Sequence, residues 1–201
     1  MIDDLIKNLP KEIIDDAVNM HGHLAPGLIV GFKLAQRALK EIRPTKDDVV
    51  MLTSETTRCV PDGLQVVCRY LLEHGGYHVY FRVYDVGKLA IQVAKNHEDQ
   101  FRLIINNDYI KENPTLDAWA NQGKCEKIPA KKIQDALWSI DIDKGIVKKP
   151  FKKVMRPDIE GKDIVACPGC GEQTTRLAMV TYKGGVVCKA CALFQKPKNG
   201  A

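Results

Sequence analysis

Two Cys-x-x-Cys pairs near the C-terminus constrain this chain more than any other feature. Cys167 and Cys170 form the first pair, Cys188 and Cys191 form the second, and seventeen residues separate the two pairs. Each pair can form a tight turn that points two thiolates at one tetrahedral ion, which is the ligand spacing of structural zinc sites. Because four protein ligands leave no coordination position open, we expect a closed, non-catalytic zinc site.

The residues between the two pairs predict how this site closes. Residues 177–182 and 186–187 have the composition of strands, and the Lys-Gly-Gly segment between them predicts a β-hairpin. Cys188 and Cys191 could open a short helix, as in a treble clef, or belong to a zinc ribbon, and the sequence leaves both folds open. Two disulfides are the alternative to zinc, but disulfides are rare in the cytoplasm.

Composition favours a soluble cytoplasmic protein. A chain of 201 residues with 45% hydrophobic content can form one domain of ordinary size plus a small module. Its acidic start, Met1-Ile2-Asp3-Asp4, differs from the basic start of a signal peptide. No apolar stretch approaches the roughly eighteen residues of a membrane span. We therefore expect no membrane association and a cytoplasmic location.

The charge of the chain is unevenly distributed. The net charge is +5, yet from Lys144 onward twelve basic side chains oppose four acidic ones, a net +8, so residues 1–143 carry −3. A basic zinc module is compatible with nucleic-acid binding, whereas a solvated, Lys-rich linker explains the same charge. The excess of Lys over Arg and the scarcity of aromatic residues favour the solvated linker.

Interleaved helical and strand patterns predict an α+β core domain. The aromatic and β-branched run at residues 77–84 predicts a strand, paired across a turn at residues 85–87 with a strand at 88–94. We expect the core at residues 1–145, a basic linker at 146–162 and the four-cysteine zinc finger at 163–201. The other expected elements are helices at residues 11–20, 28–42, 61–74, 115–121 and 131–140, and strands at 49–53 and 101–106.

Two segments carry more reactive side chains than folding requires. His21 and His23 flank a glycine in a loop before a helix, where they could bind a metal or carry a proton, although histidines without such a role are commoner. Cys59 precedes the helix expected at 61–74, and the start of a helix stabilises a thiolate. A buried structural cysteine is the commoner alternative, and Cys68, on the apolar face of that helix, fits it.

Three separated motifs stand out in these segments and shortly after them. Their residues are His21-Gly22-His23-Leu24, Pro26-Gly27, Gly31, Glu55, Arg58-Cys59, Asp62-Gly63-Leu64-Gln65 and Asp85-Val86-Gly87-Lys88-Leu89-Ala90. Together these motifs resemble the FmdE family, named after the E subunit of formylmethanofuran dehydrogenase. The likeness covers most of residues 15–95, and some members of the family append a cysteine-rich zinc module. The chain departs from the family pattern at Ala25, where cysteine is usual, and at residues 69–71, where Arg-Tyr-Leu replaces Gly-Cys-Thr.

The resemblance implies an α+β core, usually homodimeric, with a cleft where His23 and Cys59 share a second metal ion of open identity. His21, Asp62 and Lys88 would complete the candidate catalytic site. Asp62 would orient a metal ligand, and Lys88 would neutralise an anionic group of the substrate.

Three functions from different classes remain open. The first is a metal-dependent enzyme or accessory protein of one-carbon metabolism, which works beside a molybdenum or tungsten oxidoreductase and holds a metal-bound water in its core. The second is a regulatory protein whose zinc module binds nucleic acid or protein, with a steep salt dependence for nucleic acid. The third is a subunit whose core has lost catalysis and supplies only an interface. The number of metal ions per chain separates the first function from the third.

Overall fold

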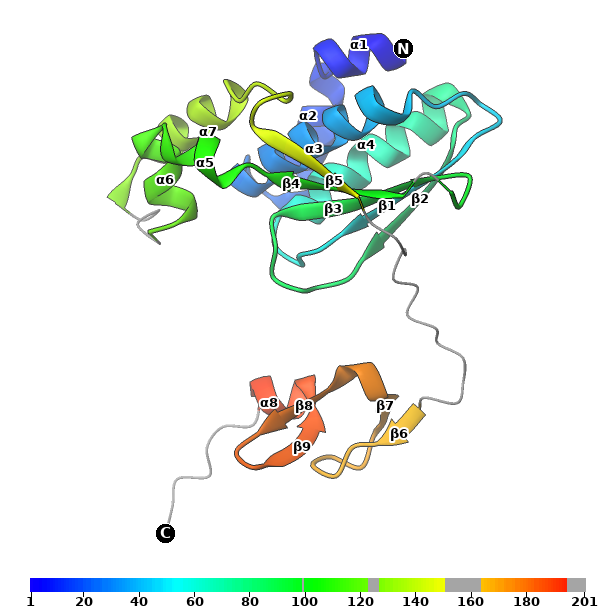
Figure 1. The fold of residues 1–201 in the computed structure, drawn as a ribbon, viewed down its shortest axis with the longest axis vertical. Helices are drawn as coiled ribbons and strands as arrows, with labels where there is room; N and C mark the ends of the chain where they lie inside the picture. Colours follow the sequence, from blue (N-terminus) through cyan, green and yellow to red (C-terminus); the bar gives the residue numbers. More distant parts are fainter. Residues whose placement is uncertain (99, 123–126, 151–163, 195–201) are drawn as a thin grey trace. The chain divides into compact units, whose positions relative to one another are not determined.

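The structure is a computed structural model that describes residues 1–98, 100–122, 127–150 and 164–194. The chain divides into two compact units, residues 1–154 and 155–201, and each is described by itself (Figure 1). The first unit is a mixed α/β core, and the second is a small β-rich module that contains the four cysteines, as the sequence predicts.

A five-stranded mixed sheet forms the centre of the core, in the order β2-β1-β3-β4-β5. The pair β1·β2 is parallel, and the other three pairs are antiparallel. A parallel pair needs a long crossover, and α4 provides it between β1 and β2. The strands are β1 (Val49–Ser54), β2 (His78–Val83), β3 (Ala90–Lys95), β4 (Phe101–Ile105) and β5 (Ile146–Pro150).

The hairpin expected between residues 77–84 and 88–94 is wrong, because β1 lies between β2 and β3. The first five residues of β3 are all buried, whereas β2 is mostly exposed, so β3 takes an inner position and β2 takes the edge. The connection therefore crosses the end of β1. There the carbonyl oxygen of Glu55 accepts the N–H groups of Val86 at 3.0 Å and Lys88 at 3.1 Å.

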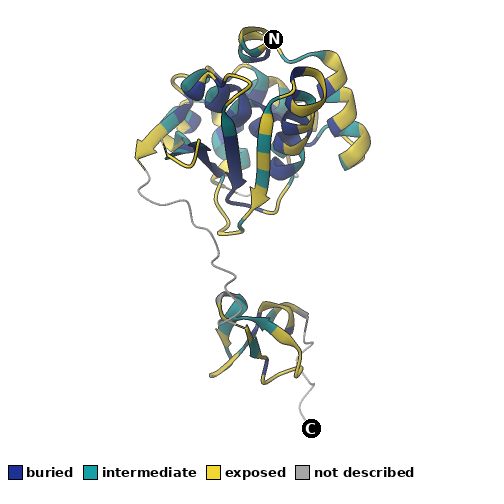
Figure 2. Ribbon diagram, turned by 90° about the vertical axis from the view of Figure 1, so that its right-hand side faces the viewer, coloured by how far each residue is buried: buried dark blue, intermediate teal, exposed yellow. Residues whose placement is uncertain are grey.

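Two long helices, α3 (Pro26–Ile42) and α4 (Val60–Gly75), pack tightly against each other beside the sheet (Figure 1). A Cβ atom at Gly31 of α3 would lie 2.5 Å from the carbonyl oxygen of Val60, and one at Gly63 of α4 would lie 2.5 Å from that of Leu28. Only glycine permits this approach at either position. Buried residues gather where these helices meet the sheet (Figure 2).

Five shorter helices complete the described core. All five helices expected from the sequence begin and end within two residues of the prediction, and α6 and α7 are the last two of the expected set. The sequence did not reveal α1 or α5, which have only six and five residues. The shorter helices are α1 (Ile2–Lys7), α2 (Lys11–His21), α5 (Asn107–Lys111), α6 (Pro114–Ala120) and α7 (Ala130–Trp138).

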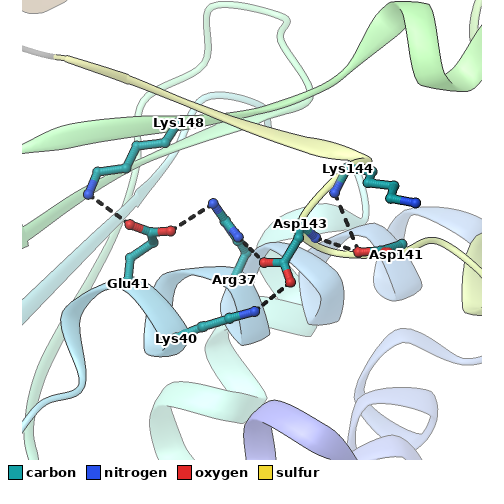
Figure 3. A network of polar contacts seen from close by, with 7 residues as sticks. All are labelled: Arg37, Lys40, Glu41, Asp141, Asp143, Lys144 and Lys148. Atoms are coloured by element: carbon teal, nitrogen blue, oxygen red, sulfur yellow. Dashed lines mark hydrogen bonds and ion pairs between the residues drawn. The ribbon is translucent and has the colours of Figure 1, made fainter.

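Residues 146–150, which the sequence places in a linker, instead form the edge strand β5 of the core sheet. Ile146 is buried in the core, and a chain of ion pairs fastens the segment to α3 (Figure 3). The Glu41 carboxylate accepts a hydrogen bond from Lys148 at 2.7 Å and forms an ion pair with Arg37 at 2.7 Å, and Arg37 also pairs with Asp143. The remainder of the expected linker lies outside the described residues.

The C-terminal unit contains two β-hairpins and a short helix. The hairpin expected between the cysteine pairs is confirmed as β8·β9, and its turn residues Lys183 and Gly184 have φ angles of 48° and 80°. Two positive φ angles are typical of the type I′ turn that suits a two-residue hairpin loop. The elements are β6 (Ile164–Ala166), β7 (Gln173–Thr175), a 3₁₀ turn (Arg176–Ala178), β8 (Met179–Tyr182), β9 (Gly185–Cys188) and α8 (Lys189–Phe194).

Candidate metal centre and core hollow

The structure brings the four C-terminal cysteines to one point. Cys167 and Cys170 occupy the turn between β6 and β7, Cys188 ends β9, and Cys191 lies in the first turn of α8. All four sulfurs lie within 4.8 Å of one another, with 3.8 Å between Cys167 and Cys191 and 3.9 Å between Cys170 and Cys188. This order of knuckle, hairpin and helix agrees with the treble clef rather than the zinc ribbon.

The environment of these sulfurs suits a metal ion. The N–H groups of Cys188 (3.1 Å) and Gly169 (3.3 Å) point at the Cys167 sulfur. These backbone hydrogen bonds lower the pKa of Cys167 to about 6, and the bond from Cys188 has the largest effect. Burial and the neighbouring sulfurs raise the pKa of Cys191 to about 12. Four such thiols cannot all ionise together without a cation, so the cluster can hold a structural metal such as zinc.

In the core, His21 and Asp62 form a close pair. The Nδ1 atom of His21, the last residue of α2, lies 2.6 Å from Oδ2 of Asp62 in the first turn of α4. Gly22 ends α2 with a φ of 96°, which reverses the chain so that the rings of His21 and His23 lie 5.0 Å apart. A carboxylate on Nδ1 fixes the imidazole tautomer and leaves Nε2 to accept a proton or a metal.

Cys59 lines a hollow of about 510 Å³ between several segments of the core. It is the N-cap residue of α4 and is partly exposed. The loop before α3 passes close by, since a Cβ atom at Gly27 would lie 2.7 Å from the Cβ of Cys59. The residues that line the hollow are Pro26, Gly27, Thr56, Arg58, Cys59, Val60, Gly87, Leu89, Trp119 and Ala120.

The candidate site residues are therefore only partly assembled. His21 and Asp62 are joined, and Cys59 faces the hollow, whereas His23 and Lys88 are exposed and are not among its lining residues. Within the described parts of the chain, the C-terminal cysteines are the only group of three or more potential ligands close enough to share an ion. A core metal held by His23 and Cys59 stays a prediction.

Sequence reasoning missed a buried ion pair between Glu55 and Arg102, next in the chain to Thr56 of the hollow. The side chain of Glu55 is 3% exposed and forms two hydrogen bonds with Arg102 of β4. The Nε atom of Arg102 lies 2.6 Å from Oε1 of Glu55, and its Nη2 atom contacts Oε2. Gln92 of β3 donates to the same carboxylate at 3.1 Å. Glu55 carries part of the family resemblance, but nothing in its spacing identifies Arg102 as its partner. Trp119, from α6, likewise reaches the hollow without a signal in the sequence.

A family model described as "FmdE, Molybdenum formylmethanofuran dehydrogenase operon" matches residues 20–149. The chain belongs to the FmdE family. It is also similar to the crystal structure of a tungsten formylmethanofuran dehydrogenase FmdE-like protein from Syntrophus aciditrophicus, with 19% identity over 90% of each chain and a TM-score of 0.52. At this identity the likeness shows a shared fold.

No curated protein matches the chain. Among the described residues, no helix combines the length and apolar character needed to cross a bilayer.

Proposed function

We propose that this FmdE-family chain is a metal-binding accessory protein that works beside a molybdenum or tungsten oxidoreductase of one-carbon metabolism. The observation that carries the proposal is the family match over residues 20–149, which includes every candidate residue of the core site. The family description refers to a molybdenum formylmethanofuran dehydrogenase operon, and the structural neighbour is named after the tungsten enzyme.

The core would hold a second metal ion through His23 and Cys59, with water or a carboxylate as further ligands. Imidazole and thiolate together suit zinc or a similar borderline ion, which when bound would activate a water or polarise a carbonyl group. The His21–Asp62 pair would hold a proton-accepting nitrogen near the start of α4. Lys88, exposed on the loop that Glu55 anchors, would attract an anionic substrate group.

Metal analysis of the purified chain tests this assignment. Two ions per chain are expected, of which Cys59→Ala or His23→Ala removes one and Cys167→Ser removes the other. Cys68→Ala is the matched control for Cys59→Ala, because Cys68 is a buried cysteine of the same helix and should leave both ions bound. One ion per chain, lost entirely in Cys167→Ser, would instead identify a core without a metal and a subunit that supplies an interface.

The same proposal includes a homodimer. Tyr80 is 57% exposed and pairs in register with Met51, which forms with Ala94 a small buried cluster separate from the main core. An exposed aromatic residue beside apolar neighbours is typical of an interface. Light scattering should give twice the chain mass for the wild type and the monomer mass for Tyr80→Glu. A monomeric wild type would remove the dimer from the proposal.

A further inference from the structure

The hollow beside Cys59 has the size of a small-molecule site. Its volume of about 510 Å³ lies within the roughly 300–1,000 Å³ of pockets that bind small ligands. Four segments far apart in the sequence form it: the start of α3, residues 56–60, the loop before β3 and the end of α6. A cavity assembled in this way is shaped by the fold as a whole rather than by one loop.

Half of the residues that line the hollow are apolar. Pro26, Val60, Leu89 and Ala120 are aliphatic, and Trp119 contributes an indole ring that is partly exposed. A tryptophan face binds planar or apolar groups and adds a specific stacking energy to the burial of area. The wall therefore suits a ligand with a flat, weakly polar part.

Arg58 gives the hollow a positive charge that the described residues do not neutralise. No hydrogen bond or ion pair joins its guanidinium to another described side chain, whereas Arg37, Arg69 and Arg102 each pair with a carboxylate. The acidic groups nearby have other partners. Glu55 is held by Arg102, Asp62 lies against His21, and Asp85 accepts from the hydroxyl of Thr57 and the N–H of Gly87.

We propose that this hollow binds a small organic anion in which a carboxylate or phosphate is attached to a planar ring, with Arg58 holding the anion and Trp119 packing against the ring. A guanidinium offers paired N–H donors that match the oxygens of either anion. The inference rests on the proposed function and deepens it, since Cys59 lines the same hollow and would face the bound ligand. It depends on Arg58 and Trp119 and does not require a metal.

Tryptophan fluorescence reports on the site directly. The chain has two tryptophans, and Trp138 stacks on Phe32 in the core at 5.9 Å between ring centroids. A Trp138→Phe background leaves Trp119 as the single reporter. Benzoate and phenyl phosphate are the two anionic probes, benzamide is the neutral ring, and acetate is the anion without a ring.

The expected result is saturable quenching by benzoate, phenyl phosphate or both, with at least about tenfold weaker binding of benzamide and acetate. The stronger of the two anionic probes tells a carboxylate ligand from a phosphate ligand. Arg58→Met should weaken the anions by about tenfold or more and leave benzamide unchanged. Arg69→Met, which removes a paired arginine of α4 that does not line the hollow, is the matched control and should bind as the parent does.

Equal affinity of benzoate and benzamide would overturn the proposal, as would unchanged anion binding in Arg58→Met or no saturation by any probe. Far-UV circular dichroism of each variant establishes that it is folded, which is expected because Arg58 is exposed. The metal count separates the two proposals. Anion binding with one ion per chain refutes only the core metal, and two ions per chain without anion binding refutes only the ligand.

Discussion

Arg102→Met tests how much the ion pair between Arg102 and the buried carboxylate of Glu55 contributes to the stability of the core. The Glu55 side chain is 3% exposed and that of Arg102 is 17% exposed, so most of their contact is shielded from water. Methionine keeps much of the volume of arginine but removes the charge and both hydrogen bonds. Glu55 would then be a buried carboxylate with Gln92 as its remaining side-chain partner in the described core.

Removing one partner of a buried ion pair costs about 3–5 kcal/mol, because the desolvated charge that remains is uncompensated. For a chain of this length, each kcal/mol shifts Tm by about 2–4 °C, so a loss of about 6–20 °C is expected. Urea unfolding and thermal scans, both followed by tryptophan fluorescence of the core, measure the two quantities. The control is Arg69→Met, whose pair with Asp16 has side chains 47% and 48% exposed and should be worth at most about 1 kcal/mol.

A double variant, Glu55→Leu with Arg102→Met, separates the buried charge from a simple loss of packing. Replacing both members of a buried pair by apolar residues is often neutral, so the double variant should be more stable than Arg102→Met alone. The reasoning is refuted if Arg102→Met costs no more than Arg69→Met. It is also refuted if removal of Glu55 as well fails to restore stability.

Three further outcomes follow from local features. Gly31→Ala should lower stability by about 1–3 kcal/mol in urea unfolding, because the added Cβ would meet a carbonyl of α4 at 2.5 Å; an unchanged midpoint would show that the helices can separate at no cost. Hydrogen bonds to the Asp48 carboxylate, of which the one from the backbone N–H of Thr45 has the largest effect, lower its pKa from 3.8 to about 2. The ionised Asp48 therefore stabilises the fold above pH 3.8, and this stabilisation is lost as the pH falls toward 2. Asp48→Asn should therefore flatten the fall of Tm between pH 4 and 2, and an identical fall in both proteins would contradict the assignment. Burial raises the pKa of Cys68 to about 12, so iodoacetamide at pH 8 should spare Cys68 in the native protein and label it after unfolding in urea, as peptide mass analysis can verify; equal labelling in the two states would contradict the burial.

Local patterns in the sequence are sufficient for most elements of the core. Apolar spacing indicates the long helices and the inner strands, and the glycines at 22 and 76 end helices with positive φ angles. Local patterns do not predict the order of the strands in the sheet. The turn-like residues 85–87 suggest a hairpin, yet the greater burial of β3 and the parallel crossover through α4 place β1 between the two strands. Pairing of that kind depends on the whole sheet.

The same limit applies to the site. His21, Cys59 and Asp62 stand out because reactive side chains lie in short motifs, and the structure joins two of them and places the third at a hollow. Arg102 and Trp119 lie in a strand and a helix with ordinary patterns, and only the fold brings Arg102 to Glu55 and Trp119 to the hollow. Lysine and proline in residues 146–150 suggest a linker, although edge strands often carry such residues and this segment is one.

The described residues of the C-terminal module form only a small hydrophobic cluster. Its buried members are Cys167, Cys188 and Cys191, with Met179 and Val187 partly covered against them. So small a cluster offsets little of the conformational entropy that folding costs, and a metal ion held by the four cysteines would supply binding free energy to the folded state. The supply of such a metal would then govern how much of this module is folded, while the core is stabilised by the packing of its own side chains.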